Sequence, residues 1–136
     1  MRARGWKTGF SLVELLIVMV IVVLLTGVAV PLYTEYVRGS RRTEAAGGLA
    51  MVAASQQTYY QRHGTFAATI ADLDVDWSDL APQWNIADPT LIAGPPPGFS
   101  CIATGKAGSG CAGLSVSMTY SFGGGKSLLD ESGKPL

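Results

Sequence analysis

A long apolar segment near the N-terminus constrains this chain most. From Phe10 to Tyr33 the sequence reads FSLVELLIVMVIVVLLTGVAVPLY, and Glu14 is its only residue that is charged at neutral pH. The segment approaches the roughly 20 residues that span a bilayer, and its apolar side chains would cover every face of a helix. Because a carboxylate costs about 2.5–3.5 kcal/mol at the centre of such a segment, Glu14 points to a function.

Two ordinary explanations of the segment stay open on these residues alone. One is a conventional signal peptide, cut near Gly27 or Ala29, and the other is a simple single-pass anchor. Basic residues stand on both sides of the segment, so charge alone does not set its orientation. The large domain that follows, with its cysteine pair, favours a cytoplasmic N-terminus. The flanking basic residues are Arg2, Arg4 and Lys7 before it and Arg38, Arg41 and Arg42 after it.

The start of the segment resembles a known processing signal. Gly9-Phe10-Ser11-Leu12-Val13-Glu14-Leu15-Leu16 follows the short basic leader MRARGWKTG. This arrangement is similar to the type III signal of type IV prepilins and the related pseudopilins. The resemblance implies that a prepilin peptidase cuts between Gly9 and Phe10 and methylates the new N-terminal phenylalanine. Pro31 and the run from Tyr33 to Val37 also resemble the family, in which the helix near the equivalent proline can unwind.

Two roles are open for Glu14 once Phe10 is the N-terminus. Within one subunit, a carboxylate in the first helical turn is favoured by the helix dipole, by about 0.3–1 kcal/mol. Between subunits, Glu14 would meet the Phe10 amine of a neighbour inside a bundle of apolar helices. Such a pair rewards one axial register, because a mismatch leaves a buried charge alone. The resemblance to pilins favours the second role, and a subunit that only caps a filament would not need the acid.

The rest of the chain predicts an α+β fold. Beyond Pro31 the pattern becomes amphipathic, with apolar residues at helical spacing to about Arg62, where His63-Gly64 supplies a stop. Strict alternation from Leu114 to Phe122 predicts a strand. Two further strands are expected at Phe99–Thr104 and Lys126–Leu129, and Gly94–Gly98 is expected to be a loop. We therefore expect a long N-terminal helix, first transmembrane and then amphipathic, packed on a small antiparallel sheet.

Cys101 and Cys111 are the only cysteines of the 136 residues. In an exported domain they are expected to form a structural disulfide, which would close a short glycine-containing loop. The pair also resembles the C-terminal disulfide of many type IV pilins. A cytosolic location would instead leave two free thiols.

Other candidate sites give weaker signals. Asp72-Leu73-Asp74-Val75-Asp76 imitates the start of an EF-hand loop, but Trp77 replaces the required glycine, so a looser calcium site or a solvated acidic loop remains. The basic cluster Arg38, Arg41 and Arg42 suits lipid headgroups, neighbouring acids or DNA, with the first two preferred. His63 is the only histidine, and no Ser or Cys nucleophile lies near it for which it could act as a base. No pattern for catalysis, zinc or a cofactor is present, so we expect no enzyme, no metal and no cofactor.

These observations predict a structural subunit of a type IV pilus-like filament. The expected parts are a leader at 1–9, a transmembrane and assembly segment at 10–33, and an exported domain at 34–136. Expected partners are further copies, other pilins, the prepilin peptidase, the inner-membrane assembly platform with its ATPase, and the membrane. The leader holds three of ten basic residues; without it seven face ten acidic ones, a net charge of −3 that gives no large basic field, so nucleic acid is not expected.

The location follows from the same interpretation. We expect a single-pass inner-membrane protein with a cytoplasmic N-terminus, which moves to an extracellular pilus or a periplasmic pseudopilus on assembly. One alternative is a pseudopilin of a type II-like secretion system. Another, from a different class, is an anchored or secreted binding domain that forms no polymer.

Overall fold

The computed structural model describes residues 9–76 and 78–136, and the chain divides into two compact units, Met1–Tyr36 and Val37–Leu136. The leader apart from Gly9, and Trp77, lie outside the described residues. One helix, α1 (Leu12–His63), contributes to both units. Its length and its end agree with the sequence pattern: Gly64 follows with a φ of 74°, and its N–H donates to the Tyr60 carbonyl at 2.8 Å. A glycine in this left-handed conformation is the common way to end a helix.

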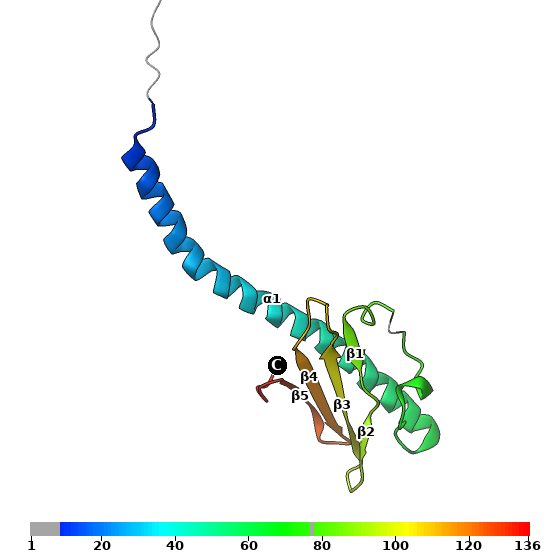
Figure 1. Ribbon diagram of the computed structural model, residues 1–136. Coiled ribbons are helices and arrows are strands. Elements are labelled where there is room, and N and C mark those ends of the chain that lie inside the picture. Colours follow the sequence, from blue (N-terminus) through cyan, green and yellow to red (C-terminus); the bar gives the residue numbers. More distant parts are fainter. Residues whose placement is uncertain (1–8, 77) are drawn as a thin grey trace, which may run out of the picture. The chain divides into compact units, whose positions relative to one another are not determined.

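The second unit is a helix packed on one antiparallel sheet (Figure 1). The strands are β1 (Trp84–Ile86), β2 (Thr90–Ile92), β3 (Gly98–Gly105), β4 (Ser115–Ser121) and β5 (Gly125–Asp130). A short 3₁₀ turn, η1 (Ile70–Asp72), lies between α1 and the sheet in sequence. This confirms the α+β class and the three longer predicted strands. Pattern analysis missed β1 and β2, since three residues are too few to show alternation.

The sheet order is β1-β3-β4-β5, and β2 also pairs with β3. β4 pairs with β3 from Gly98 to Thr104, so β1 and β2 must share the other edge of β3. At the opposite end of the sheet, the C-terminal residues turn back on β5 through a bridge between Leu129 and Pro135. One edge of the sheet is therefore built from two strands of three residues, and the other is β5 with one bridge at its end.

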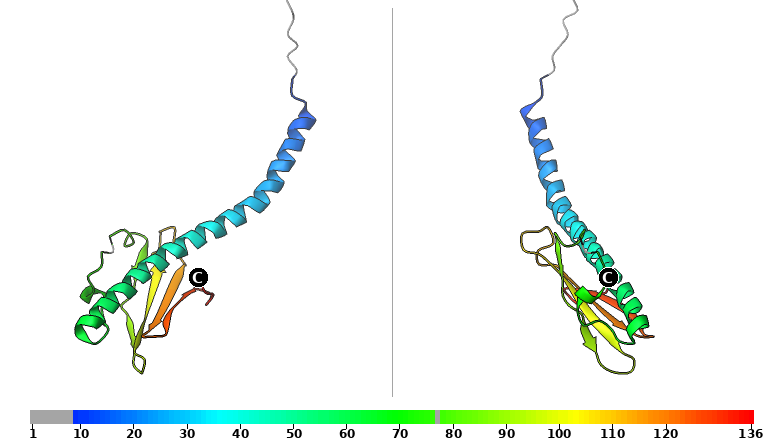
Figure 2. Two further views of the ribbon diagram at one scale, coloured as in Figure 1. Left: turned by 180° about the vertical axis from the view of Figure 1, so that it is seen from behind. Right: turned by 90° about the vertical axis from the view of Figure 1, so that its right-hand side faces the viewer.

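The core lies between the C-terminal part of α1 and one face of the sheet (Figure 2). Leu49 and Val52 from α1 are fully buried, together with Phe99 from β3 and Met118 from β4. Burial of each such side chain stabilises the fold by about 1.5–3 kcal/mol. The alternate residues of β3 and β4 are mostly serine and threonine and face away from the helix, as expected for an antiparallel sheet with one wet face.

One polar side chain belongs to this core. Gln56 is fully buried on the α1 face that carries Val52. Its amide nitrogen donates to the Ala67 carbonyl at 2.8 Å, and its amide oxygen accepts the Ala67 N–H, also at 2.8 Å. Gln56 thus satisfies both backbone groups of one residue in the segment that leaves the helix, and holds that segment against α1.

Candidate functional site

The predicted processing site lies just before the first helix. Gly9, Phe10 and Ser11 precede α1 without helical structure, and the Phe10 side chain is 76% exposed. A Cβ placed on Gly9 would meet nothing within 4 Å. The Gly9–Phe10 peptide bond therefore stands in an open segment, which suits attack by a peptidase; the cleavage itself stays a prediction.

Glu14 lies in the first turn of α1, among apolar side chains that have no partner within the unit. The large apolar residues from Leu12 to Tyr33 are between 47% and 79% exposed. An 18-residue window of this helix has a mean hydropathy of 3.0, and by length and composition the helix can cross a membrane. An aqueous surface does not tolerate such a continuous apolar patch, so lipid or other helices must cover it.

Two threonine hydroxyls of α1, one in the apolar segment and one just after it, are satisfied within the helix. The Thr26 hydroxyl donates to the Val22 carbonyl at 2.7 Å, and the Thr34 hydroxyl donates to the Pro31 carbonyl at 2.8 Å. Pro31 stands inside α1, which continues through it without interruption. Its missing N–H still removes one helix hydrogen bond. The local opening considered from sequence is therefore absent from this structure of a single subunit.

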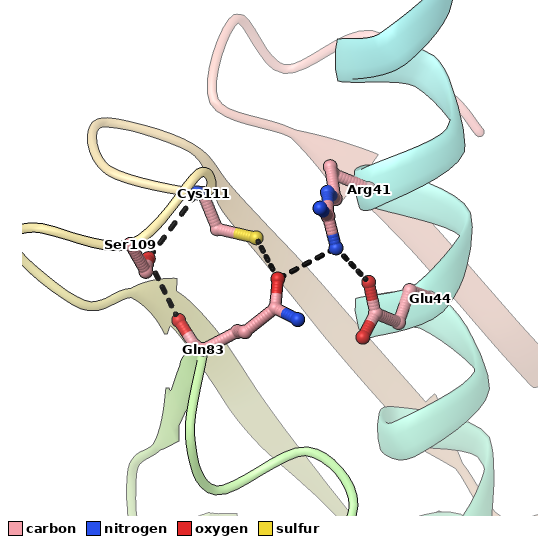
Figure 3. Close-up of polar contacts among 5 residues, drawn as sticks. All are labelled: Arg41, Glu44, Gln83, Ser109 and Cys111. Atoms are coloured by element: carbon pink, nitrogen blue, oxygen red, sulfur yellow. Dashed lines mark hydrogen bonds and ion pairs between the residues drawn. The ribbon is translucent and has the colours of Figure 1, made fainter.

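In the second unit, a polar network joins the helix to two loops of the sheet (Figure 3). Arg41 on α1 donates to the Gln83 side-chain oxygen at 2.6 Å and to Glu44 at 3.3 Å. The Ser109 hydroxyl donates to the Gln83 carbonyl at 3.3 Å, and the Cys111 thiol donates to the Gln83 side-chain oxygen at 3.4 Å. Gln83 was not identified from the sequence, because a lone glutamine in a loop carries no periodic signal.

A second contact fixes the chain's C-terminal turn to α1. The Arg42 guanidinium forms a two-pronged ion pair with the Glu131 carboxylate, in which Nε donates to Oε2 at 3.1 Å and Nη2 contacts Oε1. Hydrogen bonding from Arg42 lowers the pKa of Glu131. Arg41 and Arg42 are therefore paired with acids of their own chain, Glu44 and Glu131, which were not among the partners expected from the sequence.

The structure corrects the predicted disulfide: Cys101 and Cys111 are both free and buried. The Cys111 backbone lies against Gly105, where an added Cβ would come within 1.8 Å of the Cys111 carbonyl oxygen. Cys101 stands four residues back along β3, which is about 13 Å of strand. A disulfide requires Cα atoms within about 7 Å, so the two thiols are too far apart. The Cys101 thiol donates instead to the Ala87 carbonyl at 3.1 Å.

Both thiols are expected to be unreactive in this arrangement. Burial raises the pKa of the Cys101 thiol to about 11, and burial also raises the pKa of Cys111, against the charge of Arg41. We expect both to resist iodoacetamide at pH 8 in the folded chain, because about one Cys101 thiol in a thousand is then ionised. In denaturant without reductant, mass spectrometry should show two alkylations. A chain that gains none until it is reduced would contradict the free thiols and restore the disulfide.

The acidic segment after η1 does not have the form of an EF-hand loop. The Asp72 carboxylate accepts the Thr69 hydroxyl at 2.8 Å, and the Asp76 carboxylate accepts the Ser78 N–H at 2.9 Å. This backbone hydrogen bond lowers the pKa of Asp76. Among the described residues, no group of three or more His, Cys, Asp or Glu side chains is placed to hold a metal ion.

Comparisons with known protein families identify the class of protein to which this chain belongs. A family model described as the prokaryotic N-terminal methylation motif matches residues 7–30. Together with the apolar helix and the helix-on-sheet unit, this match defines a type IV pilin-like protein. A second model, described as type IV minor pilin ComP, DNA uptake sequence receptor, matches residues 31–115, which is more than half of the chain. The chain therefore belongs to the ComP family of type IV minor pilins. Comparisons with curated proteins and with solved structures gave no match.

Proposed function

We propose that this chain is a filament subunit, cut after Gly9 and assembled through its N-terminal helix. One observation carries the proposal: the apolar first half of α1 has no partner within its unit, and its single carboxylate is Glu14. The match of the methylation motif to residues 7–30 supports the same interpretation. Such a subunit has a structural rather than a catalytic role.

The assembly step follows from the change of surroundings. In the inner membrane, lipid covers the apolar side chains, and the N-terminus faces the cytoplasm. In a filament, the same side chains pack on neighbouring helices outside the cell. Cleavage creates an ammonium group at Phe10, and Glu14 lies four residues further on, about 6 Å along a helix. In low dielectric this ammonium group of one subunit pairs with the Glu14 carboxylate of the next and fixes their register.

The mature N-terminus tests the processing step. Mass spectrometry of protein isolated from cells should show a chain that begins at Phe10 and carries one added methyl group. A cell lacking prepilin peptidase supplies the control and should accumulate the chain with its leader. A mature chain that begins at Met1, or after Gly27 or Ala29, would contradict the proposal and favour an anchor or a signal peptide.

The family match favours a minor pilin over a pseudopilin, because the matching model describes a minor pilin. Its description also names a DNA uptake sequence receptor, which favours a second function, contact with DNA. That function runs against the expectation from charge that nucleic acid is not a partner. Arg41 and Arg42 are paired with acids, so each would have to exchange its carboxylate for a phosphate in order to contact DNA.

A titration of the full chain in detergent tests the DNA function. A fluorescent duplex should bind saturably at low salt, and the affinity should fall as salt rises, with a slope of about −0.9 per phosphate contact. Because few basic groups are available, we expect a slope of only about −1 to −3. Failure of the wild-type chain to bind any duplex at low salt would contradict this second function and leave the filament role intact.

A further inference from the structure

A hollow of about 430 Å³ lies between the last turns of α1 and the segment around η1. Side chains of α1 line one side of it, and the chain from Asp72 to Asp74 lines the other. Every lining residue that the structure describes belongs to the second unit, so the hollow is a property of that unit alone. Sites for small molecules commonly have volumes of about 300–1,000 Å³, so this hollow has room for a ligand.

The α1 side of the hollow is one helix face that carries a cation. Ser55, Tyr59 and Arg62 all line the hollow, and their spacing along α1 puts them on the same face. The His63 ring stacks on the Tyr59 ring with 4.1 Å between centroids, and its Nδ1 lies 3.1 Å from the Tyr59 carbonyl oxygen. This side therefore combines a fixed aromatic surface with the positive charge of Arg62.

The opposite side carries two carboxylates. Asp72 and Asp74 flank Leu73, which is buried and belongs to the core cluster. The Asp72 carboxylate is also positioned by the Thr69 hydroxyl, which donates to it at 2.8 Å. Two negative charges therefore line the hollow from a segment that is anchored to the fold.

The opposite charges of the hollow do not neutralise each other. Within the part of the chain that the structure describes, neither Arg62 nor Asp74 makes an ion pair or a hydrogen bond through its side chain. The Asp72 carboxylate accepts only the Thr69 hydroxyl. The guanidinium and the carboxylates thus line one hollow without contact, and a ligand between them can complete the hydrogen bonds of both.

This arrangement suits a small molecule that carries both signs of charge. Arginine forms a bidentate pair with a carboxylate, and ionised carboxylates accept strong hydrogen bonds from a cationic donor. We propose that the hollow binds a zwitterionic α-amino acid, with its carboxylate on Arg62 and its ammonium group on Asp72 and Asp74. An apolar side chain of the amino acid packs on the Tyr59 ring and Leu73. The site is separate from the filament and DNA functions proposed above.

Ligands of other charge suit the hollow less well. The two carboxylates repel an anion such as free phosphate, and Arg62 repels a metal cation. The described side chains also supply no group of three ligands placed for a metal ion. A neutral molecule would leave the charged groups without partners, whereas an amino acid pairs with both.

Ligand-observed NMR of the full chain in a non-ionic detergent tests the proposal, with leucine as the probe. Leucine should bind saturably, with half-saturation at about 1 mM or below, which is the range expected for so small a ligand. N-acetyl-leucine lacks the ammonium group and leucinamide lacks the carboxylate. Each should bind at least about tenfold more weakly than leucine, because one charge-assisted contact is lost.

Two variants assign the contacts. Arg62→Gln and Asp74→Asn should each weaken the binding of leucine about tenfold. Arg62→Gln should leave the weaker binding of leucinamide unchanged, because leucinamide has no carboxylate for Arg62 to hold. Asp74→Asn should likewise leave the binding of N-acetyl-leucine unchanged. Such non-additive losses identify which group of the ligand contacts which side chain.

Asp79→Asn and Lys134→Gln are the matched controls, since each removes an exposed charge that does not line the hollow. Both should bind leucine like wild type, and thermal melting should show that every variant is folded. Failure of wild type to bind leucine at about 20 mM would overturn the proposal. It would also be overturned if Arg62→Gln and Asp74→Asn bound leucine as well as wild type does, or if wild type bound both derivatives as well as leucine. None of these results bears on the filament or DNA function.

Discussion

Replacing Glu14 with valine should abolish incorporation of this subunit into filaments while its insertion into the membrane stays intact or improves. The carboxylate is the only charge in the apolar segment, so its removal lowers the cost of insertion, by at most the roughly 2.5–3.5 kcal/mol that a charge costs at the centre of a membrane helix. In the filament, the same change leaves the Phe10 ammonium group of a neighbour buried without a partner. Breaking a buried pair in this way costs about 3–5 kcal/mol per contact.

Two measurements separate these effects. Membrane fractionation should recover Glu14→Val at wild-type levels, and immunoblots of sheared filaments should show at least about a hundredfold loss, in line with the cost of an unpaired charge. Thr26→Val is the matched control, because it also removes a polar group from the segment, but one whose hydroxyl is satisfied by its own helix. It should assemble normally. Normal incorporation of Glu14→Val would refute the pairing between subunits and leave only the dipole role.

Replacing Gln56 with leucine should strongly destabilise the second unit. The change leaves both backbone groups of Ala67 buried without a partner, at a cost of about 1–3 kcal/mol for each group. We therefore expect a loss of several kcal/mol in the free energy of unfolding, measured by urea denaturation of the full chain in detergent. Since small domains are stable by only about 5–15 kcal/mol, the variant will be close to unfolding at physiological temperature.

The neighbouring Gln57 provides the control for this prediction. Gln57 is exposed and makes no hydrogen bond within the described residues, so Gln57→Leu should change stability by no more than about 0.5 kcal/mol. Equal stability of the two variants would show that the contact between Gln56 and Ala67 does not support the fold.

The long helix and the longer strands could be predicted because their periods repeat many times. Leu114 to Phe122 alternates strictly, and the structure places β4 within it. The apolar stripe of α1 was also visible, and Gln56 stands on it, four residues after Val52. That position, rather than the residue type, was the available sign that Gln56 is buried.

Other features depended on information that short stretches of sequence do not carry. The spacing of ten between Cys101 and Cys111 fits a small disulfide loop, but it does not reveal that Cys101 lies inside β3 while Cys111 lies beyond its end. The basic cluster after the membrane segment looked available to partners from outside. The ion-pair partner of Arg42 is Glu131, which lies 89 residues further along the chain, and no local pattern can indicate such a pair.

The edges of the sheet bear on how such a subunit is stored. Where several copies share one membrane, an open strand edge on one copy can pair with the edge of the next and seed aggregates. Here one edge is divided between two strands of three residues, with Asp88 and Pro89 in the gap between them. The other edge is partly closed by the bridge from Leu129 to Pro135. Growth through the sheets is thereby discouraged, so the proposed polymerisation through the helix has no competing route along these edges.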